Sequence, residues 1–230
     1  MGLQVYYGGT FDPVHLGHLA IARAAHDELQ ATVHLVPAAD PPHRPAPGAT
    51  AQQRSGMLQC ALADAPGLRL DLRELERAAR HPGVPSYSVD TLEALRAEHG
   101  QAQPLAWLIG ADSLLSLSSW HRWQDLFSLA HFVVAERPGS ALPARLEGTL
   151  GQALEGRWTE QVHDLRSAPA GRIFRLRQPL RPESASEVRQ AVASGAPWRH
   201  LVPPAVADYI QAQQLYGVRR DEWRPPPSNV

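Results

Sequence analysis

Histidines and glycines are concentrated in one short stretch near the N-terminus, GGTFDPVHLGHL, residues 8–19. His15 and His18 are three residues apart, so at the start of a helix they lie on the same face. Two imidazoles on one face can donate hydrogen bonds to phosphate oxygens that gain negative charge during a transfer reaction. Gly8 and Gly9 would let the backbone approach such a phosphate closely, because glycine has no Cβ. The stretch therefore predicts a phosphate site, with His15 and His18 as candidate catalytic residues.

Metal binding is the main alternative for this histidine pair. A zinc site needs further ligands, as in the H-E-x-x-H pattern, and the sequence near His15 and His18 does not supply them. We therefore expect no metal held by the protein's own ligands.

A second candidate for phosphate contact is the segment PESASEVR, residues 182–189. Ser184 and Glu187 form the S-x-x-E pattern of a capping box, which predicts the start of a helix. The side chain of Arg189 would point back toward that start, where serine hydroxyls, including that of Ser186, and free N–H groups favour an anion. Helix capping alone is the simpler interpretation, but the arginine favours a functional role, so Arg189 is a third candidate catalytic residue.

Regular elements must hold these two segments in place. Residues 3–7 are apolar and predict a buried strand before the first glycines, residues 20–26 predict a helix, and residues 31–37 predict a second strand. Strand, helix and strand within about 35 residues form the βαβ unit of a parallel sheet. Further strands are expected at 68–72, 104–109, 132–135 and 172–176, and further helices at 50–65, 88–99, 124–130, 144–154, 185–193 and 204–214. We predict an α/β fold, a Rossmann-like doubly wound parallel sheet with C-terminal helices.

The chain has one expected domain and one expected tail. Residues 1–217 carry the strand and helix patterns, with a helix and then a loop expected between 140 and 170. Residues 218–230 have no core pattern and contain an Arg-Pro-Pro-Pro run, so we predict a flexible tail there.

Composition restricts the location and the partners. The 230 residues carry a formal net charge of −1, and all 22 basic residues are arginine, without a clustered positive tract, so we expect no nucleic-acid partner. The first strand begins too early for a signal peptide, and no apolar run approaches the roughly 20 residues that span a bilayer. Cys60 is the only cysteine, which fits a reducing cytosol. We expect a soluble cytoplasmic protein without membrane contact, and a homo-oligomer is compatible with the sequence.

Both candidate phosphate segments resemble those of the nucleotidylyltransferase superfamily. Its T/S-F-D-P-x-H-x-G-H signature is matched at every specified position, by Thr10, Phe11, Asp12, Pro13, His15, Gly17 and His18. Its closing S-x-T/S-x-x-R segment is matched by Ser184, Ser186 and Arg189. Other stretches are similar to the bacterial nicotinate-nucleotide adenylyltransferases, namely PPHR at 41–44, PSYSVDTL at 85–92, IGADSL at 109–114, WHRW at 120–123, RPG at 137–139 and the closing VADYI and LY between 206 and 216.

The resemblance implies a reaction and two sets of contacts. AMP would move from Mg-ATP, with Mg²⁺ as the cofactor, to the 5′-phosphate of nicotinate mononucleotide. The implied ATP contacts are Gly8, Gly9, Thr10, Phe11, His15, His18, Gly110, Asp112, Arg137, Ser184, Ser186 and Arg189. The implied mononucleotide contacts are Asp12, Arg44, Tyr87, Ser88, Trp120 and His121. Trp120 would stack on the pyridine ring, and Arg44, where the family usually has lysine, would hold the acceptor phosphate.

Three other functions are compatible with parts of the sequence. Phosphopantetheine adenylyltransferases are similar at the first motif, but they are shorter and lack the GADS and WHRW stretches. An adenylyltransferase that prefers nicotinamide mononucleotide differs only in the acceptor. A nucleotide-binding regulator without catalysis is the third, although a pure binder would not need His15, His18 and Arg189 together.

Overall fold

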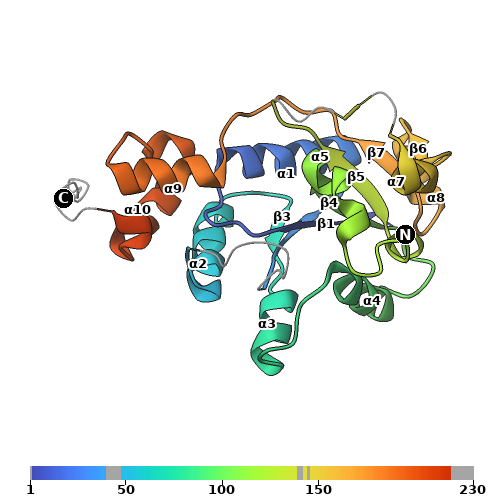
Figure 1. The fold of residues 1–230 in the computed structure, drawn as a ribbon, viewed down its shortest axis with the longest axis horizontal. Helices are drawn as coiled ribbons and strands as arrows, with labels where there is room; N and C mark the ends of the chain where they lie inside the picture. The colour runs from blue at the N-terminus through green and yellow to red at the C-terminus, as the bar shows by residue number, and fades with distance from the viewer. Residues whose placement is uncertain (1, 40–47, 139–141, 144–145, 219–230) are drawn as a thin grey trace.

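The computed structural model describes residues 2–39, 48–138, 142–143 and 146–218. Within these residues, seven parallel strands form one sheet in the order β3-β2-β1-β4-β5-β7-β6 (Figure 1). The strands are β1 (Gln4–Gly9), β2 (Val33–Pro37), β3 (Leu68–Leu70), β4 (Leu105–Gly110), β5 (His131–Ala135), β6 (Trp158–Thr159) and β7 (Ile173–Arg175). The predicted α/β fold with a doubly wound parallel sheet is confirmed.

Helices connect the strands and extend the chain beyond the sheet. The α-helices are α1 (Leu16–Leu29), α2 (Ala51–Leu62), α3 (Arg73–Arg80), α4 (Ser88–His99), α5 (Ala111–Leu115), α6 (Leu126–Leu129), α7 (Gly148–Leu154), α8 (Val162–Ser167), α9 (Ala185–Ser194) and α10 (Pro204–Ala212). Short 3₁₀ helices are η1 (Leu117–Ser119), η2 (Arg199–Leu201) and η3 (Leu215–Gly217). None of the helices in the described ranges is both long and apolar enough to cross a membrane.

The alternation of side chains along each strand produces two hydrophobic cores. Val5 and Tyr7 of β1 face a core shared with α1, α2, α8, α9 and α10, whereas Tyr6 faces a core shared with α4, α5, α6 and α7. Figure 1 accordingly shows α1 and α4 on opposite sides of the sheet. Because both faces are covered, a central strand such as β5 is buried along its whole length.

The strand order reverses between β1 and β4. The chain runs from β1 outward to β2 and β3, then returns to the other side of β1 with β4 and β5. In open parallel sheets, ligands bind in the crevice outside the carboxyl ends of the strands at such a switch point. Gly9 ends β1 and Gly110 ends β4, so the first glycine-rich motif lies at this crevice.

The C-terminal helices pack on the side of the sheet that α1 and α2 cover. Val188 of α9 and Ile210 of α10 belong to the same buried cluster as Met57 of α2. Figure 1 shows α9 and α10 beyond one end of the sheet, with α10 near α2. This packing fixes the start of α9 relative to the first motif.

Several boundaries and elements differ from the sequence predictions. The first helix begins at Leu16, not at residue 20, so His18 lies in its first turn. The region 140–170 was expected to contain a helix and then a loop, but it also contains β6 and α8. The strand β6 has only two residues, too few for a hydrophobic period. Most of the predicted tail, from 219 onward, lies outside the described residues.

Candidate active site

The first motif places two imidazoles at the start of α1. His15 is the N-cap residue, in extended conformation, and its carbonyl accepts the His18 N–H at 3.0 Å. In return, the His15 backbone N–H donates to His18 Nδ1 at 3.3 Å. Because Nδ1 accepts this hydrogen bond, the ring carries its N–H on Nε2. The two ring centroids are 3.7 Å apart, so both imidazoles occupy one small volume.

His15 is completely buried, yet neither of its ring nitrogens has a hydrogen-bond partner among the described residues. Burial, and then the positive charge of Arg137, lower the pKa of His15 from 6.5 to about 3. The ring is therefore neutral at physiological pH, with one N–H donor. A buried polar group without a partner is unusual in native proteins and is consistent with a partner that arrives as ligand.

The glycines of the motif also allow close packing inside the protein. A Cβ at Gly8 would lie 2.5 Å from Cζ2 of Trp107, so the indole of β4 leaves no room for a side chain there. At Gly17, a Cβ would lie 3.1 Å from the His15 ring and 3.2 Å from the carbonyl oxygen of Glu183. These glycines allow close packing of the motif against β4 and the segment before α9.

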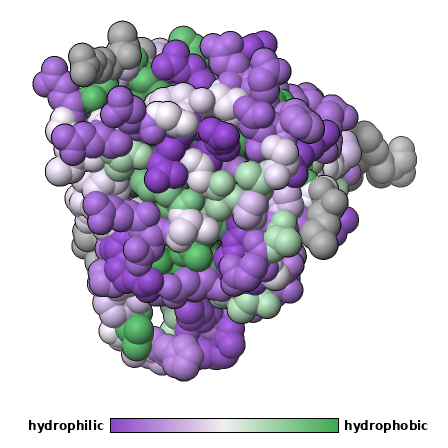
Figure 2. All heavy atoms as spheres, turned by 90° about the vertical axis from the view of Figure 1, so that its right-hand side faces the viewer, coloured by the Kyte–Doolittle hydropathy of each residue, from purple (hydrophilic) through white to green (hydrophobic). Residues whose placement is uncertain are grey.

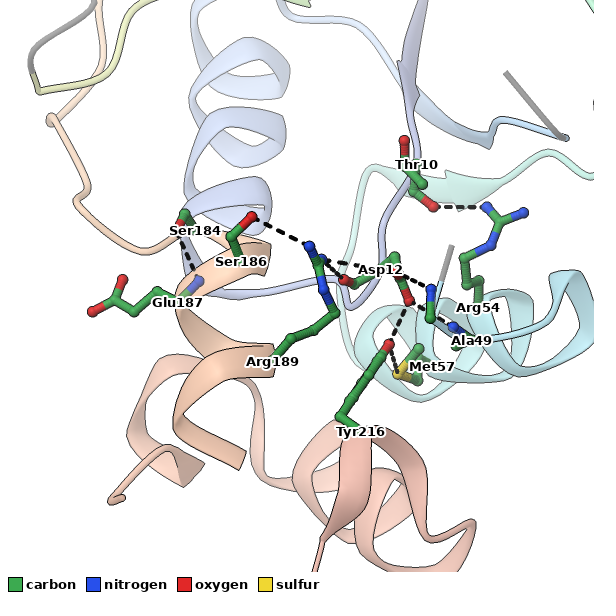
Figure 3. A network of polar contacts seen from close by, with 11 residues as sticks. Thr10, Asp12, Ala49, Arg54, Met57, Ser184, Ser186, Glu187, Arg189 and Tyr216 are labelled. Atoms are coloured by element: carbon green, nitrogen blue, oxygen red, sulfur yellow. Dashed lines mark hydrogen bonds and ion pairs between the residues drawn. The ribbon is translucent and has the colours of Figure 1, made fainter. Parts of the chain in front are cut away.

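The second candidate segment starts α9 next to the first motif. Ser184 is the N-cap residue, and its Oγ accepts the Glu187 N–H at 3.1 Å. Arg189 points back toward the helix start, where its Nη2 donates to Ser186 Oγ at 3.2 Å. Its Nη1 donates to the backbone carbonyl of Asp12 at 2.6 Å, as Figure 3 shows. The two helix starts are thus joined through a direct contact.

A cavity of about 440 Å³ lies between these helix starts. Every residue that the resemblance assigns to ATP lines it, namely Gly8, Gly9, Thr10, Phe11, His15, His18, Gly110, Asp112, Arg137, Ser184, Ser186 and Arg189. Two helix N-termini, two guanidinium groups and two imidazoles therefore line one cavity. This arrangement suits a polyphosphate.

A second cavity of about 260 Å³ adjoins the first. Four of the residues assigned to the mononucleotide line it: Tyr87, Ser88, Trp120 and His121. The ring centroids of Tyr87 and His121 lie 4.4 Å apart and the ring planes are tilted by 32°, so the two aromatic rings pack against each other beside this cavity. The two cavities share lining residues Gly8, Gly9, Thr10 and Ser113. Of the other assigned residues, Asp12 lines the first cavity instead, and Arg44 lies outside the described residues.

The second cavity also contains a buried carboxyl group that sequence reasoning missed. Glu74 of α3 accepts a hydrogen bond from Thr91 Oγ1 at 2.7 Å, and burial raises the pKa of its carboxyl group. Arg77, one turn later, donates to Thr91 Oγ1 at 2.9 Å and to Ser86 Oγ at 2.6 Å. The only sequence signal was the i, i+3 spacing of these opposite charges, which is common on solvated helices.

Arg54 is a second residue that the sequence did not reveal. Although arginine is rarely buried, Arg54 of α2 is only 1% exposed. Its Nη1 donates to the carbonyl of Thr10 at 2.7 Å, and its Nη2 donates to the carbonyl of Ala39 at 3.5 Å. The guanidinium thereby links the first motif to the chain just after β2 through hydrogen bonds.

A metal site and a cavity away from the motifs are the other candidate sites. Among the described residues, no group of three or more His, Cys, Asp or Glu side chains could hold a metal ion. A larger hollow of about 900 Å³ lies at the α7 and β6 end of the molecule and is lined by none of the motif residues. Figure 2 faces that end, where hydrophilic residues predominate around small hydrophobic areas.

The sequence is similar to proteins of known family. Residues 6–191 match the cytidylyltransferase-like family. A "Probable nicotinate-nucleotide adenylyltransferase" of Stenotrophomonas maltophilia (strain K279a) is 66% identical over 94% of this chain and 97% of its own. A protein of the same name from Xylella fastidiosa (strain 9a5c) is 49% identical with the same coverage.

Solved structures resemble the fold at much lower identity. The Plasmodium falciparum nicotinic acid mononucleotide adenylyltransferase complexed with NaAD has a TM-score of 0.70 at 16% identity, over 96% of this chain and all of that one. The same enzyme complexed with APC has a TM-score of 0.68, also at 16% identity and with the same coverage. At this identity the likeness extends to the fold and does not reach individual residues.

Proposed function

The chain belongs to the cytidylyltransferase-like family and, within it, to the nicotinate-nucleotide adenylyltransferases, and on this basis we propose that it transfers AMP from ATP to nicotinate mononucleotide. An oxygen of the mononucleotide phosphate attacks the α-phosphorus of ATP. The bond from that phosphorus to the bridging oxygen breaks, and pyrophosphate leaves with the electron pair. The product is nicotinate adenine dinucleotide, which is an intermediate of NAD biosynthesis.

One observation carries this proposal: two helix starts, bearing His15, His18 and Arg189, line a single cavity. These groups are hydrogen-bond donors, and the phosphate oxygens gain negative charge as the transfer proceeds. Donors placed in advance at that charge stabilise the transition state without reorganising. Removing one such donor typically lowers the rate by about 10²–10³-fold.

The chemistry requires positioning more than proton transfer. The attacking phosphate is already anionic, so no general base is needed, and a phosphate-transfer site depends chiefly on orientation and charge. We expect Mg²⁺ to enter with ATP, because this cation prefers phosphate oxygens and water to all-protein cages. When bound, it neutralises part of the phosphate charge. Arg189 and the two imidazoles would bind the remaining oxygens.

The second cavity suits an acceptor with a flat ring and a carboxylate. Trp120 lines this cavity with the Tyr87–His121 pair, and aromatic contacts typically add about 0.5–1.5 kcal/mol to burial. Ser88 is the first residue of α4, whose N-terminus carries a partial positive charge. The raised pKa of Glu74 favours its neutral form, which reduces repulsion of a carboxylate in the same cavity.

Pyrophosphate release tests the proposed reaction directly. Purified protein with ATP, Mg²⁺ and nicotinate mononucleotide should release pyrophosphate and form the dinucleotide in equal amounts. Omitting the mononucleotide is the control and should stop release. Protein that binds ATP in calorimetry but releases no pyrophosphate would instead be a regulator.

The acceptor preference is a separate prediction. We expect a higher kcat/KM for nicotinate mononucleotide than for nicotinamide mononucleotide, because the start of α4 favours a negative charge. Steady-state rates with each acceptor at saturating ATP measure this preference. A tenfold preference for the amide would contradict the proposed substrate while leaving the reaction class intact.

A further inference from the structure

The C-terminal segment contacts the first motif through one hydroxyl group. Tyr216 lies in η3, after α10, and its Oη donates to Oδ1 of Asp12 at 2.7 Å (Figure 3). The two residues are 204 positions apart in the sequence. Tyr216 has a φ of 58°, a left-handed conformation that is uncommon for residues other than glycine. Such conformations persist where the surrounding contacts determine them, often at functional sites.

Asp12 is surrounded by donors on both carboxylate oxygens. Oδ2 accepts the Gly48 N–H at 2.7 Å, and Oδ1 accepts the Ala49 N–H at 3.1 Å in addition to the Tyr216 hydroxyl. Oδ2 also lies 3.7 Å from Nη1 of Arg189, with the carboxylate side chain only 5% exposed. A buried carboxylate in this position holds the start of α2, the C-terminal segment and Arg189 together (Figure 3).

Arg189 must divide its donors between Asp12 and the cavity. Its guanidinium has five N–H groups, and it donates to the Asp12 carbonyl and to Ser186 Oγ. The side chain is 37% exposed and lines the cavity assigned to ATP. If Asp12 lost a donor, its less compensated charge would attract the guanidinium more strongly. Arg189 would then turn from the cavity toward Oδ2.

We propose that Tyr216 is a positioning residue for the transfer reaction, because its hydrogen bond to Asp12 keeps Arg189 directed toward the polyphosphate. This inference rests on the proposed function, since it names a further residue for the same site. Burial and the Asp12 carboxylate raise the pKa of the Tyr216 phenol, so the group keeps its proton and remains a donor. The segment after α10 thereby acts on a phosphate site that it does not line.

Tyr216→Phe removes the hydroxyl and keeps the ring. The ring packs beside Gly48, where Cε1 lies 3.3 Å from the position of a glycine Cβ, so the variant should retain this packing. We expect kcat to fall about tenfold in the wild-type background. In an Arg189→Ala background, Tyr216→Phe should lower kcat less than twofold, because the arginine whose orientation the tyrosine controls is absent. Calorimetric titration measures the Kd for ATP. Tyr216→Phe should weaken ATP binding in the wild-type background and change it much less in the Arg189→Ala background.

Two controls separate positioning from folding. Tyr209→Phe is the matched variant, because its hydroxyl lies against Gly56 of α2 and not at Asp12, and it should keep kcat within twofold. Circular dichroism at the assay temperature should show each variant folded. Equal losses from Tyr216→Phe in both backgrounds, or no loss in either, would overturn the inference. Wild-type protein that releases no pyrophosphate would overturn the proposed function instead, while the ATP titrations would still test Tyr216.

Discussion

At the scale of single residues, the hydrogen bond from the His15 backbone determines which ring nitrogen of His18 can donate a hydrogen bond. Because that bond occupies Nδ1, the ring offers Nε2–H as its donor. Phe11 packs edge-on against the same ring with centroids 5.0 Å apart, which restricts its orientation. A donor fixed in this way needs no rearrangement when phosphate charge develops.

His18→Ala should therefore lower kcat at least tenfold and leave the fold intact. The expected loss arises from one missing donor at the transferring phosphate, which typically contributes about 10²–10³ in rate. Pyrophosphate release at saturating substrates measures kcat, and circular dichroism measures the fold. His200→Ala, at an exposed position in η2, is the matched control and should keep the wild-type rate. An unchanged rate in His18→Ala would remove this histidine from the mechanism.

The sequence revealed these residue types and spacings but not their partners. His15, His18 and Arg189 could be proposed because each belongs to a local pattern of a few residues. The partners of Asp12 come from residues 48, 49, 189 and 216, and no local pattern connects them. The close approach of Trp107 to Gly8 is likewise a tertiary contact that the sequence pattern does not show.

At the scale of elements, the N-cap of α9 links stability to the site. Ser184 Oγ accepts the Glu187 N–H, which satisfies one of the unpaired donors in the first turn. The same residue lines the cavity assigned to ATP. A weakened cap would therefore loosen the segment that carries Arg189.

Ser184→Ala should lower the free energy of unfolding by about 1 kcal/mol, the usual cost of removing a serine N-cap. Urea unfolding followed by circular dichroism measures this change. Ser194→Ala, at the other end of α9, removes only an exposed hydrogen bond to the Ala191 carbonyl and serves as the control. Equal free energies of unfolding for Ser184→Ala and wild type would show that this cap does not stabilise the helix.

Elements with strong periodicity or clear caps were predictable, and short ones were not. The helix predicted over 88–99 is α4, and the serine cap correctly placed the start of α9. The helix α3 buries only Glu74, so it has no apolar face that a pattern search could find. Its contacts with α4 include the hydrogen bond from Thr91 to Glu74, a tertiary contact that no local pattern predicts.

At the scale of the whole molecule, burial of neutral histidines should make stability depend on pH. The pKa of His15 falls to about 3 in the folded protein, against an ordinary value of 6.5. Between these values the unfolded chain binds a proton that the folded protein does not. The corresponding stability is present above about pH 6.5 and is lost as the pH falls toward 3. Burial also lowers the pKa of His34 and His131, which add to the same trend.

His15→Gln should flatten this dependence, because glutamine does not titrate. Between about pH 6.5 and 5, the wild type should lose on the order of 1–2 kcal/mol more stability than the variant. Urea unfolding at a series of pH values, without nucleotide, measures both curves. The contributions of His34 and His131 are common to both proteins and cancel in the difference. Parallel curves would contradict a neutral, buried His15.

The fold as a whole was more predictable than the assembly of the site. Alternating strand and helix patterns are sufficient to indicate a doubly wound parallel sheet, and the switch between β1 and β4 then locates the crevice. The contact between Tyr216 of η3 and Asp12 joins residues 204 positions apart, and the sequence of neither segment predicts it. Only the folded molecule brings those residues together.

The common wall of Gly8, Gly9, Thr10 and Ser113 has a consequence for inhibitor design. A molecule that joins an adenosine moiety to a pyridine moiety would place one in each cavity, with its linker beside the shared lining residues. Such a two-headed compound gains from the high effective concentration of its second head, so its affinity should exceed that of either half. By the same reasoning, a dinucleotide product that fills both cavities would be bound at both ends, and its release would require it to leave both cavities.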